Sequence, residues 1–221
     1  MRPPPPARTA RNDPARRQLL RGAALGLWII GGLVLWGGAG LLCADGTCRE
    51  PALGRQILDS LDALRQPGLD VLMSAATWLG SIAVLLPCAL LLAWWVQRPG
   101  RRIAALLPLF ALGGAWLFAH LGKWLVARPR PDLHVALVPM PEDYAYPSAH
   151  AMQVTAFALA CVLVPGTRPG WAAVVTGALV VLLVALSRLY LQVHFPSDVL
   201  LGMIAATAWV LGLRLLLATR A

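Results

Sequence analysis

Long apolar runs alternate with short polar segments along this chain, and the runs have the length of membrane-crossing helices. One helical crossing needs about twenty apolar residues, and residues 22–42 contain no charged side chain at all. The pattern predicts an all-α, polytopic membrane protein with six transmembrane helices. These helices are expected at about residues 22–42, 71–96, 103–122, 149–165, 171–187 and 199–217.

Two further segments lack this apolar character. Residues 1–18 are rich in proline and arginine and are expected to form a disordered cytoplasmic tail, which leaves residues 19–221 as one six-helix membrane domain. After the first run, apolar residues recur with helical spacing and charged residues lie between them. This spacing predicts a short interfacial helix in the first outer loop. Its apolar face contains Ile57, Leu58, Leu61 and Leu64.

Charge gives the expected orientation. The net charge is +9, but the arginines gather before the first run and in short loops, as the positive-inside rule describes. A stripe that would bind nucleic acid is absent, so no nucleic-acid partner is expected. With both termini in the cytoplasm, residues 123–148 and 188–198 share the outer face. Alanine and arginine bias and small size suggest a bacterial inner membrane with this face in the periplasm; the oligomeric state stays open.

The four cysteines divide into two pairs. Cys43 and Cys48 flank a turn-rich loop and could form a disulfide in an oxidising compartment. Cys88 and Cys161 lie within apolar runs, where a packing role is the simplest interpretation. No ligand spacing typical of zinc appears, and no metal is expected.

The chemistry gathers in three polar clusters, of which the last contains His194 and Asp198. These two residues are four apart near the start of a helix, so the carboxylate can hold one imidazole nitrogen and leave the other free to attack. An ionisable pair at this depth is a candidate functional site. The alternative is a pair at the membrane edge in which the two side chains only satisfy each other's hydrogen-bonding groups and have no function.

The residues of the other clusters are of the types that bind an anion. Lys123 is the only lysine in the chain, and with Arg130 it places positive charge on the outer side. Lipid headgroups are the alternative partners for this pair, and Arg128 is equally well placed to be such a headgroup anchor. Ser148 precedes an apolar helix as a candidate N-cap, and the free N–H groups there could bind phosphate. Arg188 adds a further guanidinium, with a headgroup contact as its alternative.

Two more histidines lie near these clusters without a fixed role. His120 is one turn before Lys123 and suits helix packing or indirect support of the site. His134 lies in the long outer loop and could influence access of the substrate.

The order and spacing of the three clusters resemble the signature of the type 2 phosphatidic acid phosphatase superfamily. That signature reads Lys-x6-Arg-Pro, Pro-Ser-Gly-His and Ser-Arg-x5-His-x3-Asp, and this chain matches it at 123–131, 147–150 and 187–198. One position departs from the pattern, since Ala149 stands where the family has glycine. Alanine keeps the backbone N–H but adds a methyl group, which could tighten the pocket or slow the reaction.

The resemblance implies an integral-membrane lipid phosphatase without a cofactor. His194 would form a phosphohistidine, Asp198 would hold its imidazole, and His150 would act as general acid and base. Phosphate would be bound by Lys123, Arg130, Ser148, Ala149 and Arg188. Candidate substrates are undecaprenyl diphosphate, phosphatidic acid, phosphatidylglycerophosphate and lipid A phosphates, with a polyprenyl diphosphate first. The alternatives are a lipid phosphotransferase, a vanadate-binding haloperoxidase, and a non-catalytic phospholipid-binding or transport protein.

Overall fold

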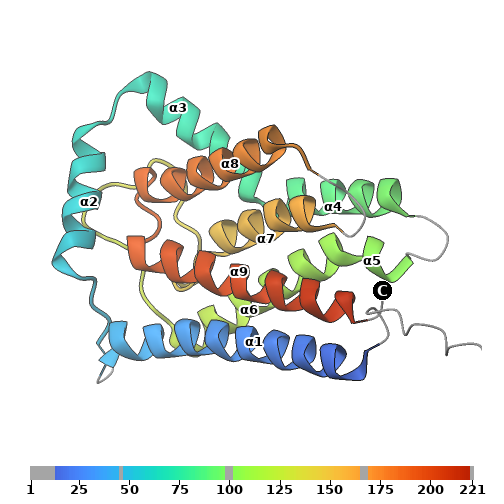
Figure 1. The fold of residues 1–221 in the computed structure, drawn as a ribbon. Helices are drawn as coiled ribbons and strands as arrows, with labels where there is room; N and C mark the ends of the chain where they lie inside the picture. Colours follow the sequence, from blue (N-terminus) through green and yellow to red (C-terminus); the bar gives the residue numbers. More distant parts are fainter. Residues whose placement is uncertain (1–12, 45–46, 98–101, 165–168, 220–221) are drawn as a thin grey trace, which may run out of the picture.

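The structure is a computed structural model that describes residues 13–44, 47–97, 102–164 and 169–219. Its helices in chain order are α1 (Pro14–Leu42), α2 (Ala52–Ala63), α3 (Pro67–Ala76), the 3-10 helix η3 (Thr77–Gly80), α4 (Ile82–Val96), α5 (Arg102–Ala105), α6 (Leu107–Val126), α7 (Ala149–Leu163), α8 (Trp171–Tyr190) and α9 (Pro196–Ala218). Figure 1 shows the long helices side by side as a bundle, with α2 across one end of it. The all-α prediction is confirmed.

Four helices are long and apolar enough to cross a membrane: α1, α6, α8 and α9. The segment from α3 through η3 to α4 passes the same test only as a pair bent by 47°, and α7 is a shorter apolar helix of 15 residues. The described residues therefore contain four or five candidate spans. A multi-pass membrane protein is supported, and the count of six crossings stays a prediction.

Two predicted boundaries were wrong. The run at 71–96 is broken at Ser81, whose side chain accepts a hydrogen bond from the backbone of Val84 and begins α4. Just before the break, a Cβ on Gly80 would lie 2.6 Å from Val184 and 3.1 Å from His150, so glycine allows the bend to press against α7 and α8. At the N-terminus, residues 14–18 belong to α1, not to a disordered tail, and residues 1–12 lie outside the described part.

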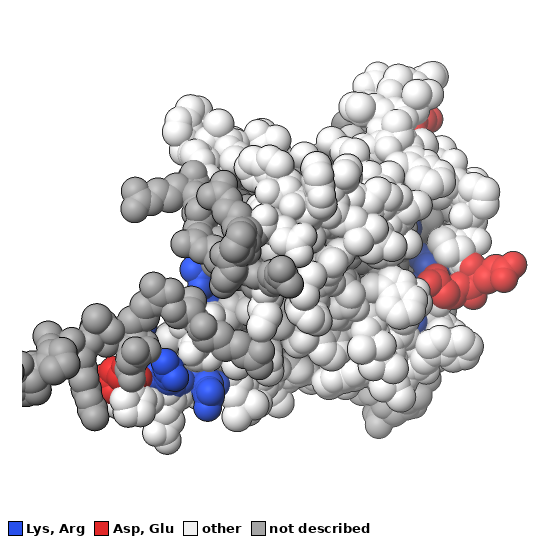
Figure 2. All heavy atoms as spheres, turned by 90° about the vertical axis from the view of Figure 1, so that its right-hand side faces the viewer, with Lys and Arg blue, Asp and Glu red and all other residues white. Residues whose placement is uncertain are grey.

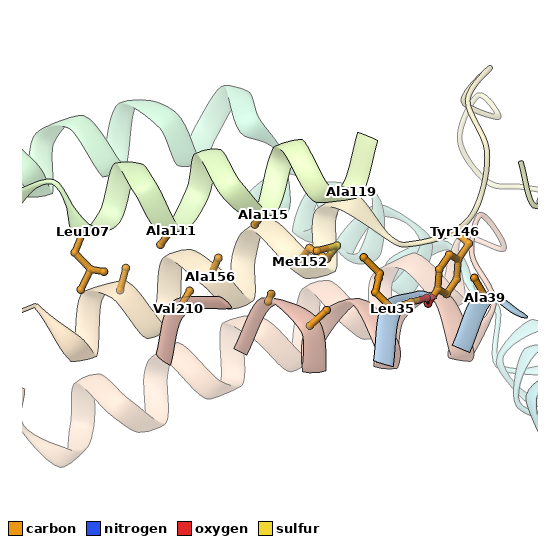
Figure 3. Packing of buried hydrophobic residues seen from close by; sticks show 13 residues of the cluster. Leu35, Ala39, Leu107, Ala111, Ala115, Ala119, Tyr146, Met152, Ala156 and Val210 are labelled. Carbon is orange, nitrogen blue, oxygen red and sulfur yellow. The ribbon is translucent and has the colours of Figure 1, made fainter. Parts of the chain in front are cut away.

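Small side chains form the centre of the bundle. Ala111, Ala115 and Ala119 follow one another along a single face of α6 and are fully buried against α7 and α9, as Figure 3 shows. Small residues let helix backbones approach closely, which favours association in a bilayer where apolar burial gives little gain. A close approach of this kind also fixes the site end, since a Cβ on Gly122 would be 2.5 Å from Cδ of Pro147.

The outer surface of the bundle is apolar. Large side chains are exposed along several helices, including Trp94, Trp124 and Trp171. In the face that Figure 2 displays, charged residues are confined to the margins and the area between is uncharged. A surface of this kind suits lipid contact.

The segment that follows α1 is tied to the bundle end. Cys43 and Cys48 are joined by a disulfide bond, and α2 follows shortly after. Leu58 of α2 is fully buried, and its carbonyl accepts a hydrogen bond from Gln192 at 2.9 Å. The predicted amphipathic helix is thus present, but part of its apolar face packs against protein. Its position at a membrane interface stays a prediction.

Two neighbouring glycines of α6 allow a test of the close packing. A Cβ on Gly114 would overlap the indole of Trp209, which packs edge to face with Phe118 and donates to the carbonyl of Phe110. A Cβ on Gly113 meets nothing within 4 Å. Both changes to alanine gain about 1 kcal/mol of helix propensity. We predict that Gly114→Ala is less stable than Gly113→Ala by about 1–3 kcal/mol, because only the first overpacks the core.

The measurement is thermal or denaturant unfolding of both variants in the same detergent. Equal stability of the two would contradict the packing described for α6 against α9.

Candidate active site

The predicted polar clusters converge at one end of the bundle. The loop from α6 to α7 and the short turn from α8 to α9 both lie at the end where α2 crosses, away from the C-terminal end of α9 (Figure 1). His194 lies within electrostatic range of His150, Lys123, Arg130 and Arg188. Residues that are up to 71 positions apart in the sequence therefore face one small region.

His194 is fully buried in the turn before α9, and its two ring nitrogens have different surroundings. Nδ1 lies 3.6 Å from Oδ2 of Asp198, and Nε2 lies 3.4 Å from Nη1 of Arg130. The same carboxylate oxygen accepts the backbone N–H of Phe195 at 2.9 Å, which fixes the carboxylate at the start of α9. One nitrogen thus faces a carboxylate, and the other faces the cationic region.

The electrostatics keep this imidazole neutral. Burial lowers the pKa of His194 well below its ordinary value, and the charges of Arg188, Arg130 and Lys123 lower it further. A neutral imidazole has a lone pair available for attack, whereas an imidazolium has none.

Arg128 completes the carboxylate side of the site, and its prediction as a headgroup contact was wrong. Its side chain is 1% exposed and donates to Oδ1 of Asp198 at 2.5 Å and to Oε2 of Glu50 at 2.9 Å. It also donates to the hydroxyl of Ser197 at 2.7 Å and lies over the ring of Phe195 at 4.4 Å. Arg128, Asp198 and Glu50 therefore form a buried charged cluster next to His194, with the partly buried Ser197 and Phe195 at its side.

Lys123 and Arg130 are held by the loop between α6 and α7. The Lys123 ammonium is 3.2 Å from Oδ2 of Asp143 and donates to the carbonyl of Tyr144. Arg130 pairs with Oδ1 of Asp143 and donates to the carbonyls of Asp143 at 2.8 Å and Val193 at 2.6 Å. Both predicted cations thus lie in the site, and each contacts Asp143.

The remaining predicted anion-binding groups lie at the ends of α7 and α8. Arg188 is buried in the last turn of α8 and donates to the hydroxyl of Thr77 at 2.6 Å. Ser148 occupies the N-cap position of α7, but its buried hydroxyl neither caps the helix nor bonds any other described residue. Its backbone N–H donates to the carbonyl of Asp198 at 3.1 Å, which joins the second cluster to the third.

His150 and Ala149 begin α7 directly after this cap. The Cβ of His150 faces Gly80 at the bend before α4. Ala149 is partly buried beside the core and has ordinary helical neighbours, so its methyl group is accommodated without a break in α7.

The two other histidines lie apart from this cluster. His120 stacks on Trp116, with its Nδ1 2.8 Å from the Trp116 carbonyl, in agreement with a packing role. His134 lies between two carboxylates of α2, 2.8 Å from Asp59 and 3.3 Å from Asp62. It therefore ties the long outer loop to α2.

The sequence did not suggest Arg128 as a site residue, nor the four residues that contact Arg128 or the predicted cations. Asp143 and Ser197 lie close to the motifs in sequence, which was weak evidence that they belong to the site. Nothing in the sequence indicated Thr77 or Glu50, because each comes from an earlier segment and reaches the site only through the fold. Asp143 contacts Lys123 and Arg130, Glu50 and Ser197 contact Arg128, and Thr77 contacts Arg188.

Curated relatives of this chain are named as phosphatases. It is 30% identical over 145 residues to phosphatidylglycerophosphatase B of Bacillus subtilis, across 63% of this chain and 70% of that protein. It is 36% identical over 102 residues to an undecaprenyl-diphosphatase of Sulfolobus acidocaldarius, across 44% of this chain. That match covers 45% of the Sulfolobus protein, so the two share less than half of its length.

The fold has a counterpart among solved structures. A transmembrane PAP2-type phosphatidylglycerolphosphate phosphatase from Bacillus subtilis superposes with a TM-score of 0.64 at 24% identity, over 89% of this chain and 94% of the other. In sequence, residues 104–221 match the model of the PAP2 superfamily, which is the type 2 phosphatidic acid phosphatase group that the three motifs indicated. Because this match spans more than half of the chain, the protein belongs to the PAP2 superfamily.

Proposed function

We propose that the protein is an integral-membrane phosphatase that hydrolyses the phosphomonoester or diphosphate of a membrane lipid through a phosphohistidine on His194. The observation that carries the proposal is the setting of that imidazole: Nδ1 faces Asp198 at 3.6 Å, and Nε2 faces Arg130 at 3.4 Å. Family membership and the names of the relatives support the same reaction class.

In the first step, Nε2 of His194 attacks phosphorus and the bond to the leaving oxygen breaks. Asp198 holds the imidazole and stabilises the positive charge that it gains. His150 gives a proton to the leaving lipid alkoxide, or to the leaving lipid monophosphate where the substrate is a diphosphate. The products of this step are phosphohistidine and either the lipid alcohol, from a phosphomonoester, or the lipid monophosphate, from a diphosphate.

In the second step, water replaces the histidine on phosphorus. His150 takes a proton from the water, the new P–O bond forms, the P–N bond breaks, and inorganic phosphate leaves. Lys123, Arg130 and Arg188 stabilise the phosphoryl oxygens in both steps, and the Ser148 hydroxyl and the N–H groups at the start of α7 add neutral donors. Three fixed cations supply the charge that Mg²⁺ supplies in other phosphoryl-transfer sites, so the reaction requires no metal.

The substrate is an amphiphile with its phosphate at the membrane surface. We favour a polyprenyl diphosphate, and the name of the Sulfolobus relative supports this class, while phosphatidylglycerophosphate follows from the Bacillus one. The arginines at the start of α1 lie away from the site, which by the positive-inside rule favours a site on the periplasmic face of an inner membrane.

The first test is phosphate release by detergent-purified protein, with EDTA present, from undecaprenyl diphosphate, phosphatidic acid and phosphatidylglycerophosphate. We expect release by the native chain and a loss of about 10⁴-fold or more in His194→Ala, since the nucleophile is removed. His120→Ala is the matched control, because this histidine stacks on Trp116 outside the site. Full activity of His194→Ala, or activity that EDTA abolishes and Mg²⁺ restores, would contradict the mechanism.

A second prediction concerns Arg128 as a positioning residue. Arg128→Lys keeps the buried positive charge but cannot bond Asp198, Glu50 and Ser197 together. Loss of this clamp misplaces the Asp198 carboxylate, and a displacement near 1 Å can cost about 10²-fold in rate. We expect kcat to fall by about 10- to 100-fold with KM nearly unchanged, because Arg128 lies behind the imidazole.

Steady-state kinetics on the preferred lipid provide the measurement. Arg55→Lys is the control, since Arg55 is an exposed arginine whose side chain, among the described residues, donates only to the backbone carbonyl of Glu50. A rise in KM at constant kcat would show that Arg128 binds the substrate directly and would overturn the positioning role.

A further inference from the structure

Asp143 occupies donors of both Lys123, in the last turn of α6, and Arg130, in the loop that follows. Its Oδ1 accepts from Nη2 of Arg130, its Oδ2 is 3.2 Å from Nζ of Lys123, and its backbone carbonyl accepts from Nε of Arg130 at 2.8 Å. In the described part of the chain, no other carboxylate forms an ion pair with either cation. The two oxygens thus bridge an ammonium and a guanidinium as two phosphate oxygens would.

The burial of the three side chains is unequal. Those of Lys123 and Arg130 are 4% and 7% exposed, whereas that of Asp143 is 48% exposed. The carboxylate therefore covers the buried cations from the open side. It also lies in the loop between α6 and α7, four residues before Pro147, and is not part of a helix that would fix it.

Asp143 is negatively charged in this position. Burial alone would raise the pKa of its carboxyl, but the charges and hydrogen bonds of Lys123 and Arg130 outweigh that effect and lower the pKa below its ordinary value. An anionic phosphate is repelled by this carboxylate and needs the same donors. Phosphate binding and the Asp143 contacts therefore exclude each other.

We propose that Asp143 is an intramolecular competitor for the phosphate-binding cations, one that makes the site select phosphate attached to a lipid over free inorganic phosphate. The inference rests on the proposed function. Every phosphate that binds must displace the Asp143 carboxylate, so its binding free energy is reduced by the free energy of the contacts between Asp143 and the two cations. A lipid phosphate compensates through its tail in the bilayer, but inorganic phosphate has only the cations to bind. After hydrolysis, the carboxylate returns to Lys123 and Arg130 and expels the product.

The neighbouring Glu142 provides a matched control. It is exposed, it lies in the same loop, and it forms no ion pair within the described residues. Asp143→Asn and Glu142→Gln each remove one negative charge from the same region, but only the first weakens the contacts to the cations. The pair thus separates direct competition from a general change in surface charge.

The experiment is calorimetric titration of inorganic phosphate into the detergent-purified full chain and these two variants, together with phosphate inhibition of lipid hydrolysis. We expect the phosphate Kd of Asp143→Asn to fall about tenfold, which equals about 1.4 kcal/mol, and its inhibition constant to fall in parallel. Glu142→Gln should stay within about twofold of the native chain, because screening by salt weakens charge effects without contact.

The other possible outcomes each contradict either the competition by Asp143 or the proposed function. Equal or weaker phosphate binding by Asp143→Asn overturns the competition, as does an equal gain in both variants, and the phosphatase proposal stands in either case. Absence of phosphate binding in all three proteins overturns the cations as a phosphate site and the proposed function with them. Asp143→Ser, whose hydroxyl cannot span both cations, replaces Asp143→Asn if the asparagine variant does not fold, and the same outcomes apply.

Discussion

The buried ion pair between Arg128 and Asp198 holds together the segments that form the site. It joins the end of α6 to the start of α9, and Glu50 adds the first outer segment to the same guanidinium. Removal of one partner from a buried pair costs about 3–5 kcal/mol, because the other charge is left uncompensated. With Oδ1 held by Arg128, Oδ2 is free to face His194. The position of the proposed nucleophile therefore depends on a contact that no single element could provide.

Close helix packing and charge balance act together at this end of the bundle. The alanine face of α6 and the contact of Gly122 with Pro147 bring the end of α6 beside the start of α7. This approach gathers several positive charges in a small volume, and like charges at short range repel strongly when water is excluded. Asp143 balances the outer pair of cations, and Asp198 with Glu50 balances Arg128. The helices can therefore pack this closely only because these carboxylates offset the repulsion between the cations.

The sequence predicted the parts of this arrangement that are local. Apolar runs indicated the helices, and the spacing of His194 and Asp198 indicated their contact, since both depend on near neighbours. The break at Ser81 was missed, because apolar residues continue on both sides of it and only the contacts of Gly80 explain the bend. The contact of Glu50 with Arg128 was missed for a related reason: 78 positions separate the two residues, and no periodicity connects them.

The contact between α1 and α9 has a consequence for biogenesis. Trp28 of α1 donates to the carbonyl of Trp209 at 3.2 Å and stacks on its ring, so the first described helix packs against the last. During synthesis α1 enters the membrane long before α9 exists, and its polar indole group and the glycines that face α9 have no protein partner until then. Arg128 and Glu50 are likewise synthesised before Asp198, so the ion pair between Arg128 and Asp198 can form only late in synthesis. The contacts between α1 and α9 can therefore form only after α9 has been synthesised and inserted.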